Sequence, residues 1–537
     1  MGRSIRLGCL ALVLLGTAVP VAQAQGTLAG VVRDATGGVL PGVTVEAASP
    51  VLIEKVRTTV TDGSGQYRIV DLRGGAYAVT FTLPGFATVV REGVELAGEA
   101  VVTVDVDMRI GAVTETITVT GETPTVDVQS TTRQQVISKD IIDALPTSRN
   151  YTSLGFLLPG VSASARDVGG ASGDTMAQLT VHGSRPGDQR IMQNGVNTMT
   201  LQVNGDRGIA VPNPGMASEV TIDTAGVSAE YGQSGIRINY IPRDGGNTFS
   251  GSTFATFATN GMQSDNITDD LKARGLPTPT AIKRTFDFNP SFGGPIKRDT
   301  LWFYFTGRVM RADQYPGGAF VNVNGYDPNN YEVVLDPTRR AYSEALWADA
   351  QVRLTSQLTP RNKIAFAWDQ QTRCSCLSGP GTPTWGSLSA TVAPEAGTNF
   401  RSPTQRLLHF EWSSPVTNQL LVEGAGVYRV ERWGNTPPNP DWSPDFVTPA
   451  QRAVLESGTL IPVLDLSNGR FSHGNFVGYN DHWVANAYVR ATMSYVRAGH
   501  QIKAGFSSSF GHLDATQYDF SPYASSSTSP VRHPSCA

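Results

Sequence analysis

Few residues in this chain have the types and spacing that could support chemistry. Cys374 and Cys376 are one residue apart, which suits a metal or redox pair, but no second pair of ligands follows them. A local disulfide, or two ordinary loop cysteines, is therefore favoured over a metal site. His473 and His482, with Asp481, could bind a metal-chelate ligand, whereas isolated loop histidines are more typical of a solvated surface. We predict no metal site and no cofactor.

Other side chains could recognise a ligand without chemistry. Four aromatic residues could stack on sugar rings, or could mark strand ends at a membrane interface: Trp433, Trp442, Tyr479 and Trp483. Arg185 and Arg190 could contact either a substrate or a surrounding protein wall. The chemical class of any ligand is left open.

The sequence carries no motif of a known catalytic centre. The patterns G-x-S-x-G, G-x-G-x-x-G and H-E-x-x-H and the P-loop are absent, and the acidic residues are scattered without an evident pair. The formal net charge is −4, and no basic block suggests a nucleic-acid footprint. We predict that the protein is not an enzyme and has no nucleic-acid partner.

The composition indicates strands joined by many turns. The 537 residues include 56 Gly and 33 Pro, and only 16% are charged, against about a quarter in an average domain. This argues against a charged helical or coiled-coil protein. Apolar residues are too plentiful, and net charge too small, for a wholly disordered chain.

The first residues predict export. Arg3 and Arg6 precede an apolar run over residues 7–19, and Ala22-Gln23-Ala24 forms an A-x-A cleavage site, so residues 1–24 are predicted to be a signal peptide. The run is too short for a membrane anchor. No later segment is apolar enough for a transmembrane helix, which leaves a β-barrel, with its period of two, as the route into a membrane.

Residues 25–109 predict a small β-sandwich. Short apolar runs alternate with Gly, Pro and Asp turns, at the spacing of sandwich strands. Four motifs resemble the carboxypeptidase regulatory-like domain, whose fold is prealbumin-like: Gly30–Asp34, Leu40–Val45, Thr61–Tyr67 and Gly75–Tyr77. The resemblance is to an accessory domain and implies no peptidase activity.

Residues 110–130 predict a linker that contains one extended, β-prone segment. Its residues are Glu115, Thr116, Ile117, Thr118, Val119 and Thr120. Such a segment is suited to adding as a strand to another protein's sheet edge. An ordinary linker strand is the alternative that these residues alone favour.

Residues 131–247 resemble the plug of a TonB-dependent outer-membrane receptor, in the Oar-like branch. The resemblance rests on a helical pattern over Gln134–Pro146 and on later motifs that include Leu179–Arg185, Ser228–Gly235 and Ile238–Thr248. It implies a mixed α/β plug inside a barrel, and it makes Glu115–Thr120 a candidate TonB box. It also implies TonB, outer-membrane lipid and an extracellular ligand as partners.

Residues 248–537 predict the first part of an outer-membrane β-barrel. Apolar and polar residues alternate, as in Ile364, Phe366 and Trp368 against Lys363 and Asp369. We expect about nine strands, from near residue 248 to near residue 511, with long and short connections in turn. This alternation is typical of outer-membrane barrels and not of soluble sandwiches.

The resemblance implies a mainly β receptor in the outer membrane of a Gram-negative-type bacterium, with a periplasmic N-terminal domain. Such a receptor imports a scarce ligand with energy transmitted by TonB. An outer-membrane surface protein for adhesion or secretion, without active import, is the alternative. Because receptors of this family close with 22 strands, we expect the sequence to be the N-terminal part of a longer protein.

Overall fold

The computed structural model describes the larger part of the chain. It covers residues 26–49, 52, 55–72, 74–96, 101–111, 116–120, 133–145, 149–163, 178–200, 212–226, 231, 235–264, 266–274, 278–378, 393–417, 419–436, 448–457, 460–465, 467, 470–473, 479–497 and 500–518. The predicted signal peptide, residues 1–24, lies outside the described residues, as do Glu115 and Trp442.

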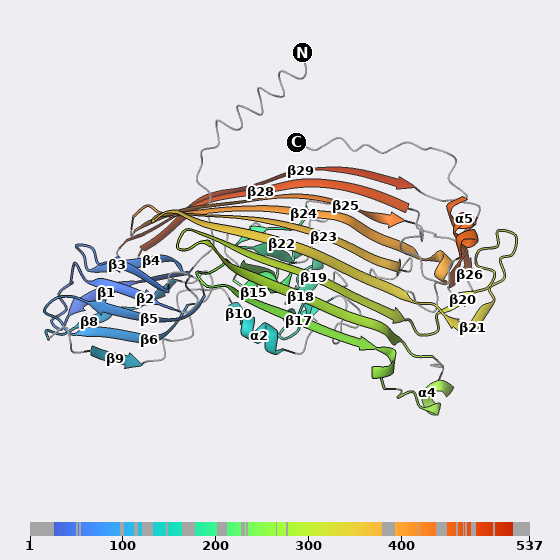
Figure 1. Cartoon of the computed structure of the whole chain (residues 1–537), viewed down its shortest axis with the longest axis horizontal. Helices are drawn as coiled ribbons and strands as arrows, with labels where there is room; N and C mark the ends of the chain where they lie inside the picture. The colour runs from blue at the N-terminus through green and yellow to red at the C-terminus, as the bar shows by residue number, and fades with distance from the viewer. Residues whose placement is uncertain are drawn as a thin grey trace, which may run out of the picture.

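The N-terminal domain is a sandwich of two sheets (Figure 1). The first sheet contains β1 (Gly26–Asp34), β4 (Gln66–Leu72), β7 (Val101–Thr103) and β8 (Val106–Met108). The second has the order β3-β2-β5-β6-β9, with β3 (Val56–Val60), β2 (Thr44–Ala48), β5 (Gly75–Thr82), β6 (Thr88–Leu96) and β9 (Thr116–Thr120). The predicted sandwich is therefore confirmed.

Alternation of side chains along the strands builds the core of this domain. On β5, Tyr77, Val79 and Phe81 are buried while the residues between them are more exposed, because successive strand residues point to opposite faces. Tyr67 packs edge-on against Phe81, and its hydroxyl donates to the carbonyl of Val104. The residues of this core come from both sheets, so the apolar faces of the two sheets bury each other.

The plug combines a five-stranded sheet with short helices. The sheet has the order β10-β15-β16-β13-β14, with β10 (Arg133–Ser138), β15 (Ala217–Ala225), β16 (Arg237–Pro242), β13 (Arg190–Gln193) and β14 (Val196–Asn197). The smaller elements are α2 (Lys139–Ala144), α3 (Tyr151–Gly155), β11 (Val161–Ala163), β12 (Leu179–Val181), η1 (Pro186–Asp188) and η2 (Pro214–Met216). No helix among the described residues is long and apolar enough to cross a membrane.

The predicted helix over Gln134–Pro146 is wrong in its first half. Residues Arg133–Ser138 form β10, which pairs antiparallel with β15 from Gln134 to Ser138. The helix begins only at Lys139, where the Ser138 hydroxyl accepts a hydrogen bond from the amide of Ile141. A long-range ladder to β15 thus overrides the local helical spacing, which a sequence window cannot detect.

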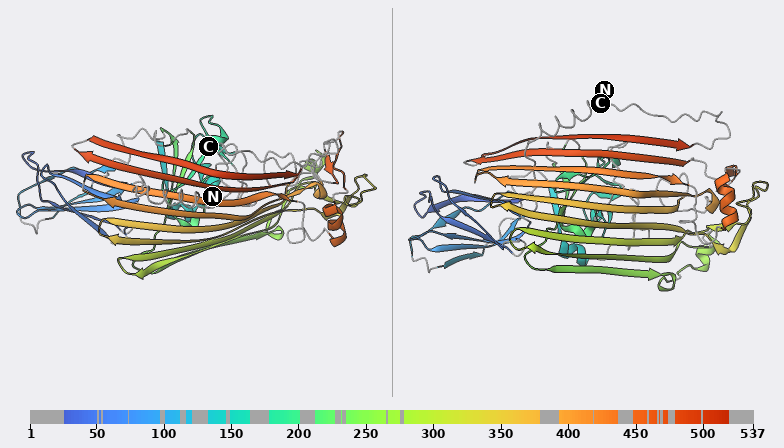
Figure 2. Two further views of the ribbon diagram at one scale, coloured as in Figure 1. Left: turned by 90° about the horizontal axis from the view of Figure 1, so that it is seen from above. Right: turned by 45° about the horizontal axis from the view of Figure 1, so that its top comes forward.

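Nine antiparallel strands form one long, curved sheet, which we call the long sheet (Figures 1 and 2). They are β17 (Ser250–Thr259), β18 (Ala281–Lys297), β19 (Leu301–Tyr315), β22 (Ser343–Thr359), β23 (Asn362–Ser378), β24 (Thr398–Pro415), β25 (Leu420–Thr436), β28 (Tyr479–Arg497) and β29 (His500–Tyr518). The expected nine strands are confirmed.

In the long sheet, the exposed side chains are apolar and the covered side chains are charged, which is the reverse of a soluble sandwich. On β24, Phe410 is 45% exposed, while its neighbours His409 and Glu411 are 1% and 0% exposed. On β23, Phe366 is 44% exposed between Lys363 and Asp369, which are buried. The outward face is therefore apolar and the covered face is charged, as in a strand that faces lipid on one side.

Long and short connections alternate between the strands of the long sheet. The short ones are residues 298–300, 360–361, 416–419 and 498–499, and the long ones are 260–280, 316–342, 379–397 and 437–478. The long connections contain η3 (Asn260–Met262), α4 (Asp269–Ala273), β20 (Phe320–Asn322), β21 (Leu335–Arg340), η4 (Pro394–Ala396), α5 (Pro449–Ser457), β26 (Val463–Asp465) and β27 (Arg470–Ser472). This confirms the predicted alternation.

The three parts have distinct positions (Figures 1 and 2). The plug lies against one face of the curved sheet, and the N-terminal domain lies at the end where the short connections join the strands. The long connections gather at the opposite end. The packing of the plug explains why the charged face of the long sheet is buried.

Candidate functional site

The candidate TonB box is an edge strand of the N-terminal domain. Its residues Thr116–Thr120 form β9, which pairs parallel with β6 from Thr88↔Thr116 to Glu92↔Thr120. In the sheet order β3-β2-β5-β6-β9, the strand is terminal. The segment that the sequence predicts to be extended is thus extended, and it is already part of a sheet.

The N-terminal domain contacts the short-connection end of the long sheet. The side-chain amide of Gln419 donates to the Asp62 carboxylate over 3.2 Å. Burial raises the pKa of Asp62, but hydrogen bonds from Ser64, Gln66 and Gln419 outweigh it and hold the pKa below its usual value. Burial lowers the pKa of Arg68 to about 10, and Glu423 of β25 acts in the opposite direction. Charged groups therefore face each other across this contact.

The N-terminal domain also contacts the plug. Gly74 lies directly against Glu219 of β15, so that a Cβ atom on residue 74 would come within 2.1 Å of a carboxylate oxygen. A cavity of about 730 Å³ opens beside this contact, lined by all three parts of the chain, including Glu95, Lys139 and Ser250. The glycine is what permits the close approach.

Asp244 of the plug contacts three side chains of the long sheet. The Arg353 Nε donates to its carboxylate over 2.7 Å, the Thr355 hydroxyl donates over 2.7 Å, and the Lys363 ammonium lies 3.4 Å away. Arg353 also donates to Glu411 of β24 over 2.5 Å. All of these side chains are buried, so each charge is compensated by a neighbour and not by water.

Further polar contacts join the β13–β14 turn of the plug to the long sheet. The Asn194 amide donates to Glu411 over 2.9 Å, and Arg490 donates to the carbonyl of Gly195 over 2.8 Å. Arg429 donates to the carbonyl of Thr198 over 2.5 Å. The guanidinium groups of the long sheet thus satisfy backbone carbonyls at the surface of the plug.

The loop before β15 is held on β18, β19 and β22. The Asn213 amide donates to both carboxylate oxygens of Asp349, over 3.1 and 3.0 Å, and the Tyr304 hydroxyl donates to the carbonyl of Gly215 over 3.0 Å. Met310 and Trp347 of the long sheet belong to the apolar core of the plug. The plug is therefore fixed by both polar and apolar contacts.

Three long connections meet at Glu395. The Asn322 amide donates to its carboxylate over 2.8 Å, and the backbone amide of His473 donates over 3.4 Å. The His473 ring in turn lies 3.0 Å from the carbonyl of Asn330, through Nε2. Burial raises the pKa of Glu395 and lowers the pKa of His473. We call these residues the loop junction.

The structure separates the two candidate histidines. His473 is buried in the loop junction, whereas His482 of β28 stacks on the Trp433 ring with centroids 4.0 Å apart. Asp481 pairs with Arg432 over 2.7 Å. The described residues contain no group of three or more His, Cys, Asp or Glu side chains that could hold a metal ion.

The other candidate ligand residues are dispersed as well. Arg185 is exposed, Arg190 donates to the carbonyls of Gly187 and Gln189 within the plug, and Trp483 is on the exposed face of β28. They do not converge on one surface.

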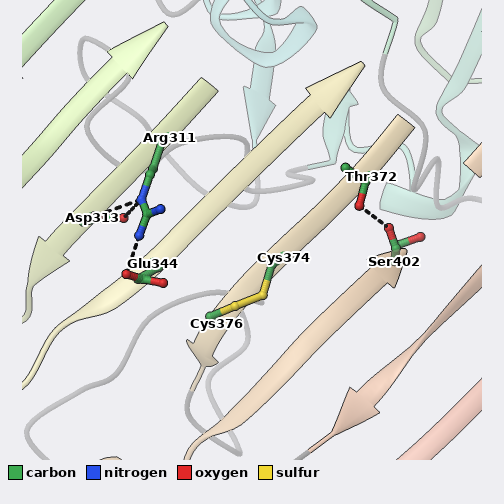
Figure 3. Close-up of a disulfide and its surroundings, with 7 residues drawn as sticks. All are labelled: Arg311, Asp313, Glu344, Thr372, Cys374, Cys376 and Ser402. Carbon is green, nitrogen blue, oxygen red and sulfur yellow. Dashed lines mark hydrogen bonds and ion pairs between the residues drawn. A yellow bond between two sulfur atoms is a disulfide. The ribbon is translucent and has the colours of Figure 1, made fainter. Parts of the chain in front are cut away.

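Cys374 and Cys376 form a disulfide within β23 (Figure 3). Both residues are buried, and the neighbouring hydrogen bond from Thr372 to the Ser402 carbonyl joins β23 to β24. The Arg311–Glu344 ion pair, at 2.5 Å, joins β19 to β22 on the same part of the sheet. The local disulfide, one of the favoured alternatives, is the one that the structure contains.

The residues that hold the plug were missed in the sequence. Asp244, Arg353 and Glu411 are far apart along the chain, and only the fold brings them within hydrogen-bonding distance. One signal was available: charged residues recur on the face of β22–β25 opposite the aromatic residues. That pattern predicts which face of the sheet is covered, but it does not predict which residues of the plug bind there.

Two family models match the chain. Residues 27–109 match the carboxypeptidase regulatory-like domain, and residues 127–237 match the TonB-dependent receptor plug domain. Among curated proteins, the TonB-dependent transporter Oar of Myxococcus xanthus is 27% identical over 370 residues, which are 66% of this chain and 33% of Oar. The chain thus spans about a third of the length of this relative.

Among solved structures, two outer-membrane proteins are similar to parts of this chain. The outer membrane transporter YddB from Escherichia coli is 11% identical with a TM-score of 0.47, over 71% of this chain and 48% of that one. The ferripyoverdine receptor of Pseudomonas aeruginosa is 10% identical with a TM-score of 0.45, over 73% of this chain and 44% of that one.

The domain models agree with the order of the folded parts. The first model covers the sandwich from β1 to β8, and the second covers the plug from β10 to the beginning of β16. The chain therefore contains a carboxypeptidase regulatory-like domain followed by a TonB-dependent receptor plug domain, and it is a homologue of the TonB-dependent transporter Oar.

Proposed function

We propose that this chain acts as a TonB-dependent outer-membrane receptor, which imports a scarce ligand with energy from the inner-membrane proton gradient. The regulatory-like domain lies in the periplasm, next to the short connections, and the long connections face the outside. The chain binds and moves its ligand without chemical change. TonB, outer-membrane lipid and an extracellular ligand are its partners.

One observation carries the proposal most directly. The plug lies on the charged face of a sheet whose other face is apolar, and Asp244 and Asn194 bind charged residues of that sheet. An apolar interface would be sufficient for a plug that only stabilised the sheet. Hydrogen bonds and ion pairs can be replaced by bonds to water when the plug moves, so a polar interface suits a plug that must shift.

The candidate TonB box is the segment that we expect TonB to bind and pull. Ile117 and Val119 are central in β9, and the main chain of the box would pair with a strand of TonB. Force applied there passes along the chain to Arg133, where β10 of the plug begins. We expect the contacts of Asp244 and Asn194 with the long sheet to break when this force is applied.

The first test of this proposal needs no ligand. TonB is co-purified from cells with the full-length protein, either unaltered or with Ile117→Pro and Val119→Pro. Proline removes the amide hydrogen and disrupts strand pairing, so the double variant should recover at least tenfold less TonB. Ile110→Pro, outside the box, is the matched control. Equal recovery with the box variant would contradict the proposal.

Uptake is the second test. Labelled probes of three classes, a ferric siderophore, an oligosaccharide and a peptide, are supplied to cells. For a probe that the unaltered protein accumulates, the box variant should keep surface binding and lose accumulation. Undiminished accumulation in the box variant would show that import, if it occurs, does not use this segment.

A further inference from the structure

The box is held by the regulatory-like domain, and this arrangement decides how a partner strand can reach it. The parallel ladder joins β9 to β6 at five register positions, from Thr88↔Thr116 to Glu92↔Thr120. Among the described strands, only β6 is hydrogen-bonded to β9. The box is therefore a sheet edge and not a free segment.

The opposite edge of the same sheet is not equivalent. It is formed by β3, whose residues Val56–Thr59 line a cavity of about 390 Å³ together with Gln357 of β22 and with Asp299 and Arg361 from the short connections of the long sheet. Figure 1 shows β3 and β9 on opposite sides of the domain. Strand addition at β3 would meet the long sheet, whereas β9 is the edge on the other side of the domain (Figure 1).

The backbone of β9 can bind strands on both of its sides. In a β-strand, the amide and carbonyl groups of alternate residues point to opposite sides in the plane of the sheet. One set is used by β6, and the other set is directed outward from the end of the sheet. An added strand would complete the outward set without breaking any pair with β6. If TonB instead removed β9 from the sheet, the pairing of β9 with β6 at all five register positions would have to break first.

We infer that TonB adds its strand to the outer edge of β9 while β9 stays paired with β6, so that the regulatory-like domain is part of the TonB-binding surface. This inference rests on the proposed function, since it takes TonB as the partner. Recognition is through the main chain, as an extra strand next to β9. The regulatory-like domain then presents the box in an extended form and shares the load when TonB pulls.

Hydrogen–deuterium exchange on the unaltered protein tests this arrangement. The full-length protein in detergent micelles is mixed with the purified periplasmic domain of TonB, and exchange is followed in residues 88–96 and 116–120. We expect slower exchange in β9, by at least fivefold at its outward amides, and no change in β6. Faster exchange in β6 on binding would overturn the inference, because it would mean that TonB takes β9 away.

A covalent lock gives a second, independent test. Val90 and Thr118 are register partners, so Val90→Cys with Thr118→Cys, in a Cys536→Ser background, can fix β9 to β6. The oxidised and reduced forms should bind the TonB domain with dissociation constants within about twofold of each other. If the reduced form binds the TonB domain at least tenfold more tightly than the oxidised form, the inference is overturned.

The two tests separate this inference from the proposed function. If neither the unaltered protein nor the reduced variant binds the TonB domain, the proposed function fails, and the inference fails with it. If the unaltered protein and the reduced variant bind the TonB domain but the oxidised variant does not, the function stands and the inference fails. The single variants Val90→Cys and Thr118→Cys, treated identically, control for the effect of the reductant on the Cys374–Cys376 disulfide.

Discussion

Arg353 of the long sheet and Asp244 of the plug form a buried ion pair, with the Arg353 Nε 2.7 Å from the carboxylate. Residues 109 positions apart in the chain thereby join two parts of the molecule. Because Arg353 also binds Glu411, the guanidinium lies between one carboxylate that belongs to the plug and one that belongs to the sheet. In the proposed movement of the plug, Arg353 can keep Glu411 as a partner, whereas Asp244 leaves its partners behind on the sheet.

Loss of the Asp244 carboxylate should loosen the plug. Asp244→Ala leaves Arg353, Thr355 and Lys363 without their shared acceptor, and removal of one member of a buried pair costs about 3–5 kcal/mol. We expect denaturant to release the plug at a lower concentration, as measured by hydrogen exchange in β15 and β16. The matched control is Asp269→Ala, which removes an exposed ion pair with Lys272 and should leave plug release unchanged. Equal effects of the two variants would contradict the role of Asp244.

The outward face of the long sheet should require apolar residues. Phe410→Arg places a charge where we expect lipid, which costs about 2–4 kcal/mol near the middle of a bilayer. The variant should insert less well into lipid vesicles, as measured by protease protection after refolding. Ile110→Arg is the matched control, since Ile110 is 87% exposed in the N-terminal domain and away from the sheet. Similar insertion of both variants would mean that this face does not meet lipid.

Glu395 should make the loop junction more stable at acidic pH. His473 of the same junction should act in the opposite direction, because burial lowers its pKa and the opened state therefore takes up a proton first as the pH falls. Burial raises the pKa of Glu395 above its ordinary value of 4.5, although Asn322, His473 and Arg470 act in the opposite direction. The folded state therefore keeps a proton that the opened state loses, and stability falls as the pH rises through the window above 4.5. Exchange in residues 319–341 and 470–473, corrected for intrinsic rates, should therefore rise more with pH over this window in the unaltered protein than in a variant in which residue 395 cannot ionise.

Glu395→Gln tests the origin of this pH dependence. The amide keeps an acceptor for Asn322 but cannot lose a proton, so the dependence should flatten. Glu332→Gln changes an exposed glutamate in one of the same connections and should leave the dependence as it is. A dependence that persists in Glu395→Gln would assign it to another group.

The Cys374–Cys376 disulfide should contribute little to stability. The bridged residues are two positions apart, and the chain-entropy relation gives about 1.5 kcal/mol for so short a loop. Replacement of both cysteines by serine should therefore lower the unfolding temperature by a few degrees and leave the fold intact, as measured by circular dichroism. A variant that fails to fold would show that the disulfide is needed to form β23.

Periodicity made much of the fold predictable. Residues such as Phe366 and Phe410 alternate with Lys363, His409 and Glu411, and a period of two can only place them on opposite faces of a strand. The same reasoning gave the sandwich, the nine strands and their alternating connections. It failed at Gln134–Ser138, where pairing with β15 outweighs a local helical pattern.

The contacts of the candidate site join residues that are far apart in the chain, and local sequence patterns do not encode such contacts. The sequence determined that Thr116–Thr120 is extended, because β-branched residues favour a strand. Only the tertiary structure decided that this strand pairs with β6, that Asp244 meets Arg353, and that His473 and His482 lie apart. Each of these outcomes depends on which distant segment supplies the compensating hydrogen bond or charge, and that choice is made when the whole chain packs.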